Sequence, residues 1–222
     1  MVLPPLALVL SQPDLGTSLV FGAVLIGVLF VSGASLRWMT LFGVAAVAST
    51  PIVWNYVLKD FQKQRLLSIL DPSSDAQGSL YQVTQSQIAV GSGGLFGKGL
   101  TNGVISDRYL PVNTTDFAGA VLLEELGFIG GMVVLLLFTA LIWRILLAGW
   151  RSSDPFGLAF AAGVASMILF QLLVNLGMVI GLMPVTGIPL PFITHGGASI
   201  ISIAIGLGIL QSVNLRQARP KW

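Results

Sequence analysis

Long uncharged stretches divide this chain into apolar segments that are long enough to cross a membrane. A bilayer core about 30 Å thick needs about 20 helical residues. The uncharged intervals therefore predict five crossings, at about residues 15–36, 38–58, 117–147, 156–182 and 198–213. The last two come from one uncharged run, which is too long for a single helix and is interrupted by prolines and a glycine pair.

The composition agrees with this pattern and excludes several other classes of protein. Hydrophobic residues make up 55% of the chain and charged residues 9%, whereas soluble domains average about 25% charged. We therefore predict an all-α fold, a polytopic transmembrane helical bundle forming a single membrane domain over residues 1–222. The absence of cysteine and the single histidine exclude a disulfide framework, a thiolate metal site and a His-rich metal centre. A net charge of +2 gives no reason to expect a nucleic-acid partner.

A polar island, residues 59–116, lies between the second and third predicted crossings. It holds five of the eleven basic and five of the nine acidic residues. Basic and apolar positions mix over residues 61–70, which predicts a short helix in the headgroup layer. A second, partly apolar helix is predicted over residues 80–90, followed by a glycine-rich loop at residues 91–99. Chemistry on a charged substrate is therefore expected in this island.

The positions of Lys and Arg in short loops predict how the chain is oriented. Arg37, the Arg144 and Arg151 pair and the basic C-terminal tail fall on one side if the crossings alternate. That side is predicted to be the cytoplasm, which places the island outside. The opening ten residues are apolar but too short to span, so we expect them to end a helix whose beginning is missing from this chain.

Three acidic residues at or within an apolar helix are candidates for chemistry, and each has a structural alternative. Asp116 opens an apolar helix, where a carboxylate can cap the free N–H groups or serve as a base. Glu124 and Glu125 lie two turns into a membrane helix, where a charge is costly and is either paired or functional. Asn175 and Gln171, inside a crossing, are expected to bond between helices.

The glycine-rich loop also allows two interpretations. Its bare N–H groups and Lys98 could meet an anion, or its glycines could allow tight packing between helices. It is not a Walker A loop, because Ser92 occupies the position of the first glycine and Gly99 follows the lysine.

Several short motifs occur in the order typical of one family. They are Gln12 to Ser18 (QPDLGTS), Gln64-Arg65, Leu70 to Asp75 (LDPSSD), Tyr81-Gln82, Gln85-Ser86, Ile88 to Gly99 (IAVGSGGLFGKG), Thr115 to Phe117 (TDF), Leu123 to Gly127 (LEELG), Asn175 to Met178 (NLGM) and Pro189 to Phe192 (PLPF). Through these motifs the chain resembles the SEDS family (shape, elongation, division and sporulation), and most of all its RodA branch. The chain departs from the family pattern in two places. Val112 and Thr114 stand where the family often has Glu and His, and Thr194 to Ala198 (THGGA) replaces the usual SYGGS, so His195 inherits no role.

The resemblance implies a bacterial peptidoglycan glycosyltransferase of the cytoplasmic membrane. Such proteins polymerise lipid II at the outer face, in cell-shape control and elongation, among membrane lipids and with a class B penicillin-binding protein as transpeptidase partner. Family members have more crossings than this chain, which would supply the C-terminal part of the fold. The family's essential aspartate maps onto Asp116.

These implications define the expected site. We expect Asp116 to act as the base or to orient the acceptor hydroxyl. Arg65 would bind the pyrophosphate through its bidentate fork, helped by Lys63 and Lys98. The other predicted substrate-binding residues are Glu124, Asp14, Gln85 and Ser86. A divalent cation, Mg²⁺ or Mn²⁺, could share the work.

Two other functions fit the same sequence. A lipid II flippase would use buried polar residues as a path and make no bond, although it would need ionisable groups spread through the crossings. A non-catalytic scaffold would only position the transpeptidase.

Overall fold

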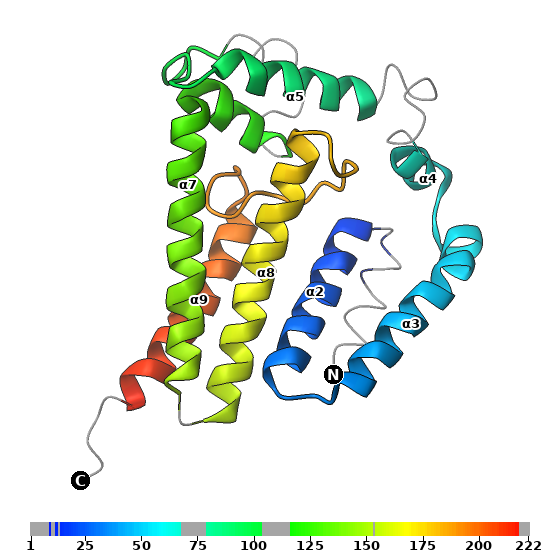
Figure 1. Ribbon diagram of the computed structural model, residues 1–222, viewed down its shortest axis with the longest axis vertical. Helices are drawn as coiled ribbons and strands as arrows, with labels where there is room; N and C mark the ends of the chain where they lie inside the picture. Colours follow the sequence, from blue (N-terminus) through cyan, green and yellow to red (C-terminus); the bar gives the residue numbers. More distant parts are fainter. Residues whose placement is uncertain are drawn as a thin grey trace. The chain divides into compact units, whose positions relative to one another are not determined.

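The computed structural model describes Val9, Gln12 and residues 14–67, 79–103, 116–152 and 154–217. All secondary structure within these ranges is helical (Figure 1). The helices are α2 (Leu15–Val31), α3 (Leu36–Ile52), the π-helical turn η1 (Val53–Val57), α4 (Asp60–Leu67), α5 (Ser79–Gly93), α7 (Ala118–Trp150), α8 (Pro155–Val179) and α9 (Gly197–Gln217). Parts of the predicted outer loop, residues 68–78 and 104–115, lie outside the described residues, as does the end of the basic tail, residues 218–222.

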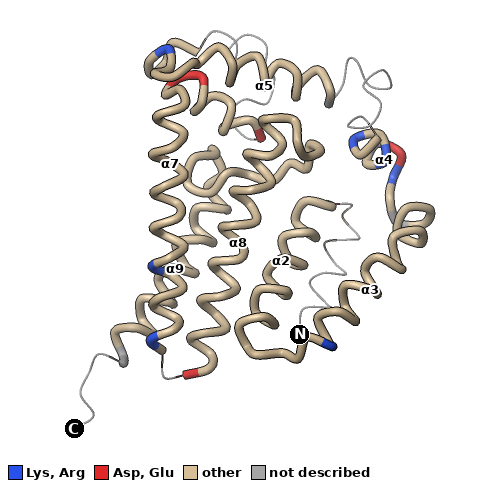
Figure 2. Tube along the Cα trace, in the orientation of Figure 1, with Lys and Arg blue, Asp and Glu red and all other residues tan. Residues whose placement is uncertain are grey.

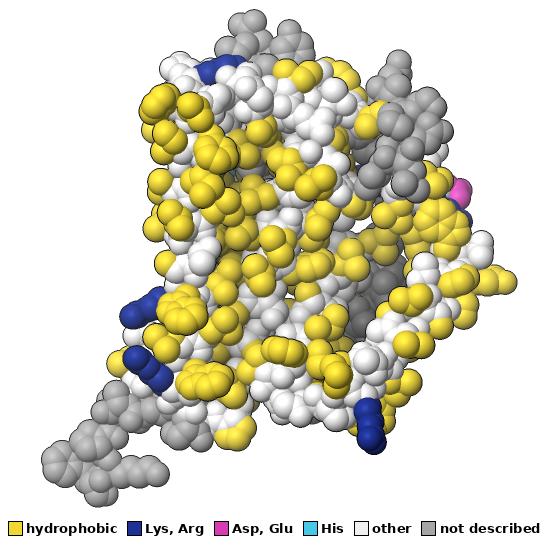
Figure 3. All heavy atoms as spheres, viewed as in Figure 1, with side chains coloured by type: hydrophobic (Ala, Val, Ile, Leu, Met, Phe, Trp, Pro, Cys, Tyr) yellow, Lys and Arg dark blue, Asp and Glu magenta, His cyan; other side chains and the backbone are white. Residues whose placement is uncertain are grey.

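Four of the described helices are long and apolar enough to cross a membrane, which confirms the predicted all-α membrane fold. They are Leu36–Tyr56, Ala118–Trp150, Pro155–Val179 and Gly197–Leu215. Helix α2 is a fifth apolar helix, but with 17 residues it is shorter. Hydrophobic side chains are widely exposed on the visible faces of these helices, as expected where lipid replaces water (Figure 3).

The chain divides into two compact units, and each is described by itself. The first contains residues 1–59, 141–170 and 201–222, and the second contains residues 60–140 and 171–200. The division falls inside α7, α8 and α9, so each of these helices contributes to both units. A single membrane domain stays a prediction.

In the first unit, Asp14 caps α2. Its carboxylate accepts hydrogen bonds from the Thr17 backbone N–H at 3.0 Å and from the Thr17 hydroxyl at 2.6 Å. An aspartate at this position satisfies a free N–H group and meets the positive end of the helix dipole. Asp14 therefore has a structural role here, and its predicted substrate contact remains a prediction.

In the second unit, the start of α7, the end of α8 and α5 share an apolar core. Phe117, Met178 and Val179 are 0% exposed within it. The buried Ser86 hydroxyl donates to the carbonyl of Val179 at 2.8 Å, and the Gln87 side chain donates to the carbonyl of Ile180 at 3.0 Å. These bonds tie α5 to the end of α8, so the polar half of this amphipathic helix has a packing function.

Candidate functional site

A buried asparagine holds the backbone at Asp116. Asn175 of α8 is 0% exposed, and its Nδ2 donates to the backbone carbonyl of Asp116 at 2.9 Å and to that of Ile188 at 2.8 Å. One carboxamide thus fixes the residue that precedes α7 against the chain that follows α8. Its Oδ1 is buried without a hydrogen-bond partner among the described residues, so the side chain serves here as a donor.

The carboxylate of Asp116 is half-buried and pairs with no cation of the described residues. A Cβ added at Gly187 would lie 3.7 Å from its Oδ2, so the carboxylate faces this glycine without a bulky neighbour on that side. Among the described residues it takes part in no hydrogen bond or ion pair, and it does not cap α7. Its main chain is held while its side chain stays available, which suits a group that accepts a proton from a bound molecule.

The second polar feature is a break in α7 at Gly127, which has φ 67° and ψ −168°. In an unbroken helix, Phe128 and Ile129 would donate to the carbonyls of Glu124 and Glu125. Here those N–H groups donate instead to the carbonyls of Gly94 and Leu95, at 2.9 and 3.1 Å. The carbonyls that they leave accept from the N–H groups of Lys98 and Gly99, both at 3.0 Å. Two helix bonds are therefore replaced by four bonds to the glycine-rich loop.

This docking requires glycine at the points of closest approach. A Cβ on Gly97 would lie 2.1 Å from the carbonyl oxygen of Glu125, and one on Gly127 would lie 2.2 Å from the Gly97 nitrogen. The N–H of Gly97 donates to the carbonyl of Gly93, and the next two N–H groups bond to α7. The loop therefore packs against a helix, and these three N–H groups do not form a phosphate cradle.

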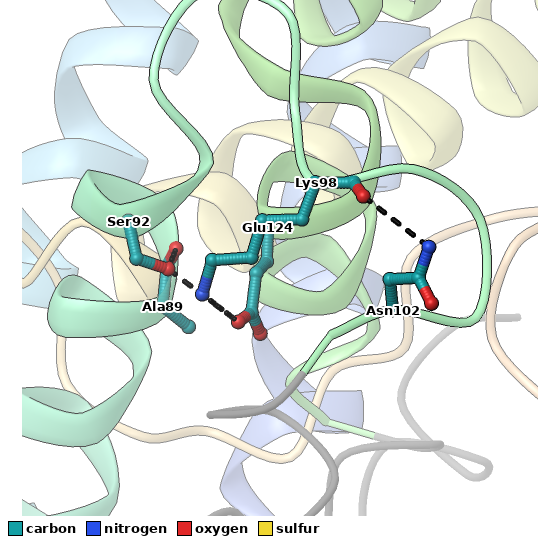
Figure 4. A network of polar contacts seen from close by, with 5 residues as sticks. All are labelled: Ala89, Ser92, Lys98, Asn102 and Glu124. Carbon is teal, nitrogen blue, oxygen red and sulfur yellow. Dashed lines mark hydrogen bonds and ion pairs between the residues drawn. The ribbon is translucent and has the colours of Figure 1, made fainter.

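A buried ion pair lies beside this break (Figure 4). Glu124 is 0% exposed, and its Oε1 lies 2.6 Å from Nζ of Lys98, whose side chain is 29% exposed. The Ser92 hydroxyl lies 3.4 Å from the same oxygen and donates to the carbonyl of Ala89 at 2.7 Å. Glu125 accepts from the Thr101 N–H at 2.9 Å. Glu124 is thus paired with a cation, as one of its two predicted alternatives required. Substrate binding by Glu124 and Lys98 stays a prediction.

The remaining predicted site residues lie on α4 and α5 of the same unit. Arg65 is exposed and Lys63 half-buried on α4, and Gln85 is half-buried on α5. The structure pairs neither α4 cation with the Asp116 carboxylate.

A metal site is not formed by the described part of the chain. No group of three or more His, Asp or Glu side chains gathers there as a set of ligands. Two of the predicted substrate-binding carboxylates have other partners, Asp14 as a helix cap and Glu124 in an ion pair. Use of a divalent cation stays a prediction.

An apolar cavity of about 520 Å³ lies in the same unit, between α5, α7 and α8. Its lining includes Val90, Leu123, Phe128, Leu176 and Leu190, and every other lining residue is also apolar or glycine. A space of this kind suits a hydrocarbon chain and offers no side chain for acid–base chemistry.

The fold and site define a polytopic helical membrane protein in which a carboxylate without a partner among the described residues is held by its backbone at the start of α7. The family model for FtsW/RodA/SpoVE, described as "Cell cycle protein", matches residues 1–219. The chain belongs to this family, as its motifs indicated.

Relatives of the chain agree with this assignment. It is 42% identical over 215 residues to the peptidoglycan glycosyltransferase MrdB of Escherichia coli K12, covering 96% of this chain and 58% of the relative. It is 41% identical over 207 residues to the stage V sporulation protein E of Bacillus subtilis 168, covering 93% and 56%. The chain therefore spans somewhat more than half the length of the curated relatives it matches.

Two solved structures share the fold. One, reported for the coordination of polymerization and crosslinking by a peptidoglycan synthase complex, matches with a TM-score of 0.76 and 33% identity, over 99% of this chain and 61% of that one. The other, a variant of the Thermus thermophilus rod shape determining protein RodA, matches with a TM-score of 0.64 and 30% identity, over 99% and 56%.

The docking of the loop on α7 gives a prediction about Gly97. Gly97→Ala should lower the free energy of unfolding by at least about 1–2 kcal/mol, because alanine disfavours a left-handed conformation and its Cβ would meet the Glu125 carbonyl. Gly91→Ala is the matched control, since a Cβ there meets nothing within 4 Å. The control should be neutral or slightly stabilising in α5. Thermal unfolding of the two purified variants, followed by tryptophan fluorescence, tests this, and equal midpoints would contradict it.

The ion pair gives a second prediction, an asymmetry between its two partners. Lys98→Met should destabilise the protein by about 3 kcal/mol, because it removes the cation beside a buried carboxylate. Glu124→Gln should cost less, because the partly exposed lysine can turn toward water. The double variant should recover much of the loss in the same unfolding measurement. A double variant as unstable as the sum of the single variants would show that the two side chains are not coupled.

Proposed function

We propose that this protein takes part in peptidoglycan synthesis as a glycosyltransferase that polymerises lipid II, with Asp116 as its catalytic carboxylate. The observation that carries the proposal is the combination of a held backbone and a free carboxylate face at Asp116, within the described residues. Within a family whose members include a named peptidoglycan glycosyltransferase, the Asp116 carboxylate has no hydrogen bond or ion pair to any described residue, while its backbone carbonyl is held by Asn175. Glu124, eight residues further along, is neutralised by Lys98.

The reaction needs a base at an acceptor hydroxyl. Asp116 takes the proton as the hydroxyl oxygen forms the new C–O bond to the anomeric carbon of the lipid-linked sugar. The bond from that carbon to the pyrophosphate oxygen breaks, and the pyrophosphate leaves with the electron pair. A base that is positioned for such a transfer contributes about 10²–10⁴-fold to the rate.

The leaving pyrophosphate needs cationic groups and its lipid needs an apolar surface. Arg65 and Lys63 on α4 are the proposed pyrophosphate contacts, since a guanidinium binds phosphate oxygens in bidentate fashion. Gln85 of α5 is proposed to contact the sugar. The apolar cavity between α5, α7 and α8 offers hydrocarbon-compatible surface in the same unit.

The proposed setting is the bacterial cytoplasmic membrane, with the polar island outside and the C-terminus in the cytoplasm. The positive-inside rule supports this orientation, because it places the basic residues Arg37, Arg144 and Arg151 on the cytoplasmic side. A class B penicillin-binding protein is the proposed partner. The match to a complex described as coordinating polymerization and crosslinking supports that choice.

The central prediction concerns Asp116. Asp116→Asn keeps the shape of the side chain but cannot take a proton, so glycan formation should fall by about 10²–10⁴-fold without loss of folded protein. The measurement is gel analysis of glycan chains formed from lipid II by purified protein reconstituted with a class B penicillin-binding protein. Asp60→Asn, at an exposed aspartate of α4, controls for the loss of one negative charge and should retain activity.

The same reconstitution separates the competing functions. If fluorescent lipid II moves across the bilayer and no glycan chains form, the protein is a flippase and not a glycosyltransferase. Full glycan formation by Asp116→Asn would remove Asp116 as the base. Crosslinking that depends on the protein when the protein itself makes no glycan would favour a scaffold.

A further prediction tests the support of Asp116. Asn175→Leu leaves one buried carbonyl, that of Ile188, and one partly buried carbonyl, that of Asp116, without their donor. The buried one should cost about 1–3 kcal/mol and the other less, and glycan formation should fall because Asp116 loses its position. Asn55→Leu is the control, because Asn55 makes a bond of the same kind, to the Pro51 carbonyl at 2.9 Å, on an exposed helix face. Unfolding midpoints and polymerisation rates are measured for both. Equal effects of the two substitutions would contradict a special role for Asn175.

A further inference from the structure

A second cavity, of about 200 Å³, lies in the first unit between α7 and α9. Four polar side chains line it: Arg144 of α7, Arg151 directly after α7, and Gln211 and Asn214 of α9. The lining also includes Ile145 and Leu210, which are 3% and 5% exposed and close the cavity toward the protein interior. The volume exceeds the roughly 30 Å³ that one water molecule occupies in the liquid, so a group larger than water can enter.

The helical spacing of the four polar residues places them around one space. Arg151 follows Arg144 by seven residues and lies in the turn after α7, where its N–H still donates to the Leu147 carbonyl at 3.1 Å as in a helix. Gln211 and Asn214 are three residues apart on α9. Residues at these spacings lie on one face of a helix. The two faces line one space, so the cavity follows from the helices themselves and not from the conformation of a loop.

The side-chain N–H donors of the four polar lining residues form no hydrogen bond to the described residues. Neither arginine forms an ion pair or a side-chain hydrogen bond within the described residues, and the same holds for both carboxamides. The nearest acid along the chain, Asp154, accepts from the Phe156 N–H at 3.0 Å at the start of α8 and is paired with neither arginine. A guanidinium has five N–H donors and a carboxamide two. The cavity therefore presents many donors and two positive charges, and no carboxylate of the described residues is paired with them.

We propose that this cavity binds the phosphate of an anionic phospholipid headgroup. Two guanidinium forks suit phosphate oxygens, which they bind in bidentate fashion. The carboxamides supply additional neutral donors. Basic pockets between membrane helices are typical sites for acidic headgroups. In Figure 2 the basic positions of α7 lie along the half of the helix that belongs to this unit.

The apolar part of the lining favours a lipid over a free anion. Leu141, Leu147 and Leu207 join Ile145 and Leu210 around the polar groups, and these side chains can contact the first carbons of an acyl chain. Both flanking helices are of membrane-spanning length and composition. Figure 3 shows basic side chains beside large hydrophobic ones along the visible edge of this region. This site is separate from the proposed catalysis, so it stands whether or not the protein polymerises lipid II.

Native mass spectrometry of the purified full chain in detergent tests the proposal. The probe is phosphatidylglycerol, with phosphatidylcholine of the same acyl chains as the neutral-headgroup comparison. One phosphatidylglycerol should bind in preference to phosphatidylcholine. Arg144→Gln and Arg151→Gln should each weaken that binding by about fivefold, and the double variant by about 25-fold. Both arginines are exposed, so these variants should keep the fold.

Two controls separate a built site from general attraction to a charged surface. Arg37→Gln removes an exposed positive charge at the start of α3, outside the cavity, and should leave the affinity unchanged. Arg144→Lys keeps the charge but not the fork, and should bind less well than the unaltered protein.

Three results would overturn the proposal. They are equal binding of the two lipids, an effect of Arg37→Gln as large as that of the cavity variants, and displacement of the lipid by equimolar inorganic phosphate. The last result would assign the cavity to a soluble anion.

Discussion

Backbone N–H and C=O groups that are buried need hydrogen-bond partners within the protein, because an apolar interior offers none. The second unit is organised by the way in which two interruptions of its helices meet this requirement. At Gly127, α7 gives up two of its own hydrogen bonds and gains four from the loop over residues 94–99. After α8, the chain from Ile188 to Thr194 is fixed by the Asn175 carboxamide and by the Thr194 hydroxyl, which accepts from the Leu190 N–H at 2.7 Å. Both interruptions are possible only because other segments supply these bonds.

The position of Asp116 follows from these two interruptions. Its carbonyl shares Asn175 with Ile188, so the segment before α7 and the segment after α8 are fixed by the same side chain. Phe117, the next residue, is 0% exposed in the core formed with Met178 and Val179. The backbone at Asp116 is therefore held at its carbonyl and at the next residue, while its half-buried carboxylate has no hydrogen bond or ion pair to any described residue. A group held in this way loses little conformational entropy when it meets a substrate, which is the condition for effective positioning.

The sequence predicted the apolar elements far better than the contacts among them. Charge-free intervals located the long helices because the cost of burying charge in lipid limits where a helix can run. The break at Gly127 was not predicted, because no proline marks it and the residues on both sides are helical and apolar. Its partner, the loop containing Lys98, is distant in sequence, so spacing alone could not separate an anion cradle from a packing contact. Likewise Asn175 was expected to bond between helices, but its two carbonyl acceptors depend on the path of a chain that no local pattern specifies.

Two carboxylates near the start of α7 show why burial alone does not identify a reactive group. Glu124 is the more deeply buried, at 0% exposure, yet a lysine 2.6 Å away compensates its charge. Removing a carboxylate from water costs several kcal/mol unless a partner is supplied, so this residue needs Lys98 whatever the protein does. Asp116 is only half-buried, so water can solvate its carboxylate without a cation beside it. Within the described residues, the less buried of the two carboxylates is therefore the one left open to a bound molecule, and it faces a glycine, at position 187, that has no side chain.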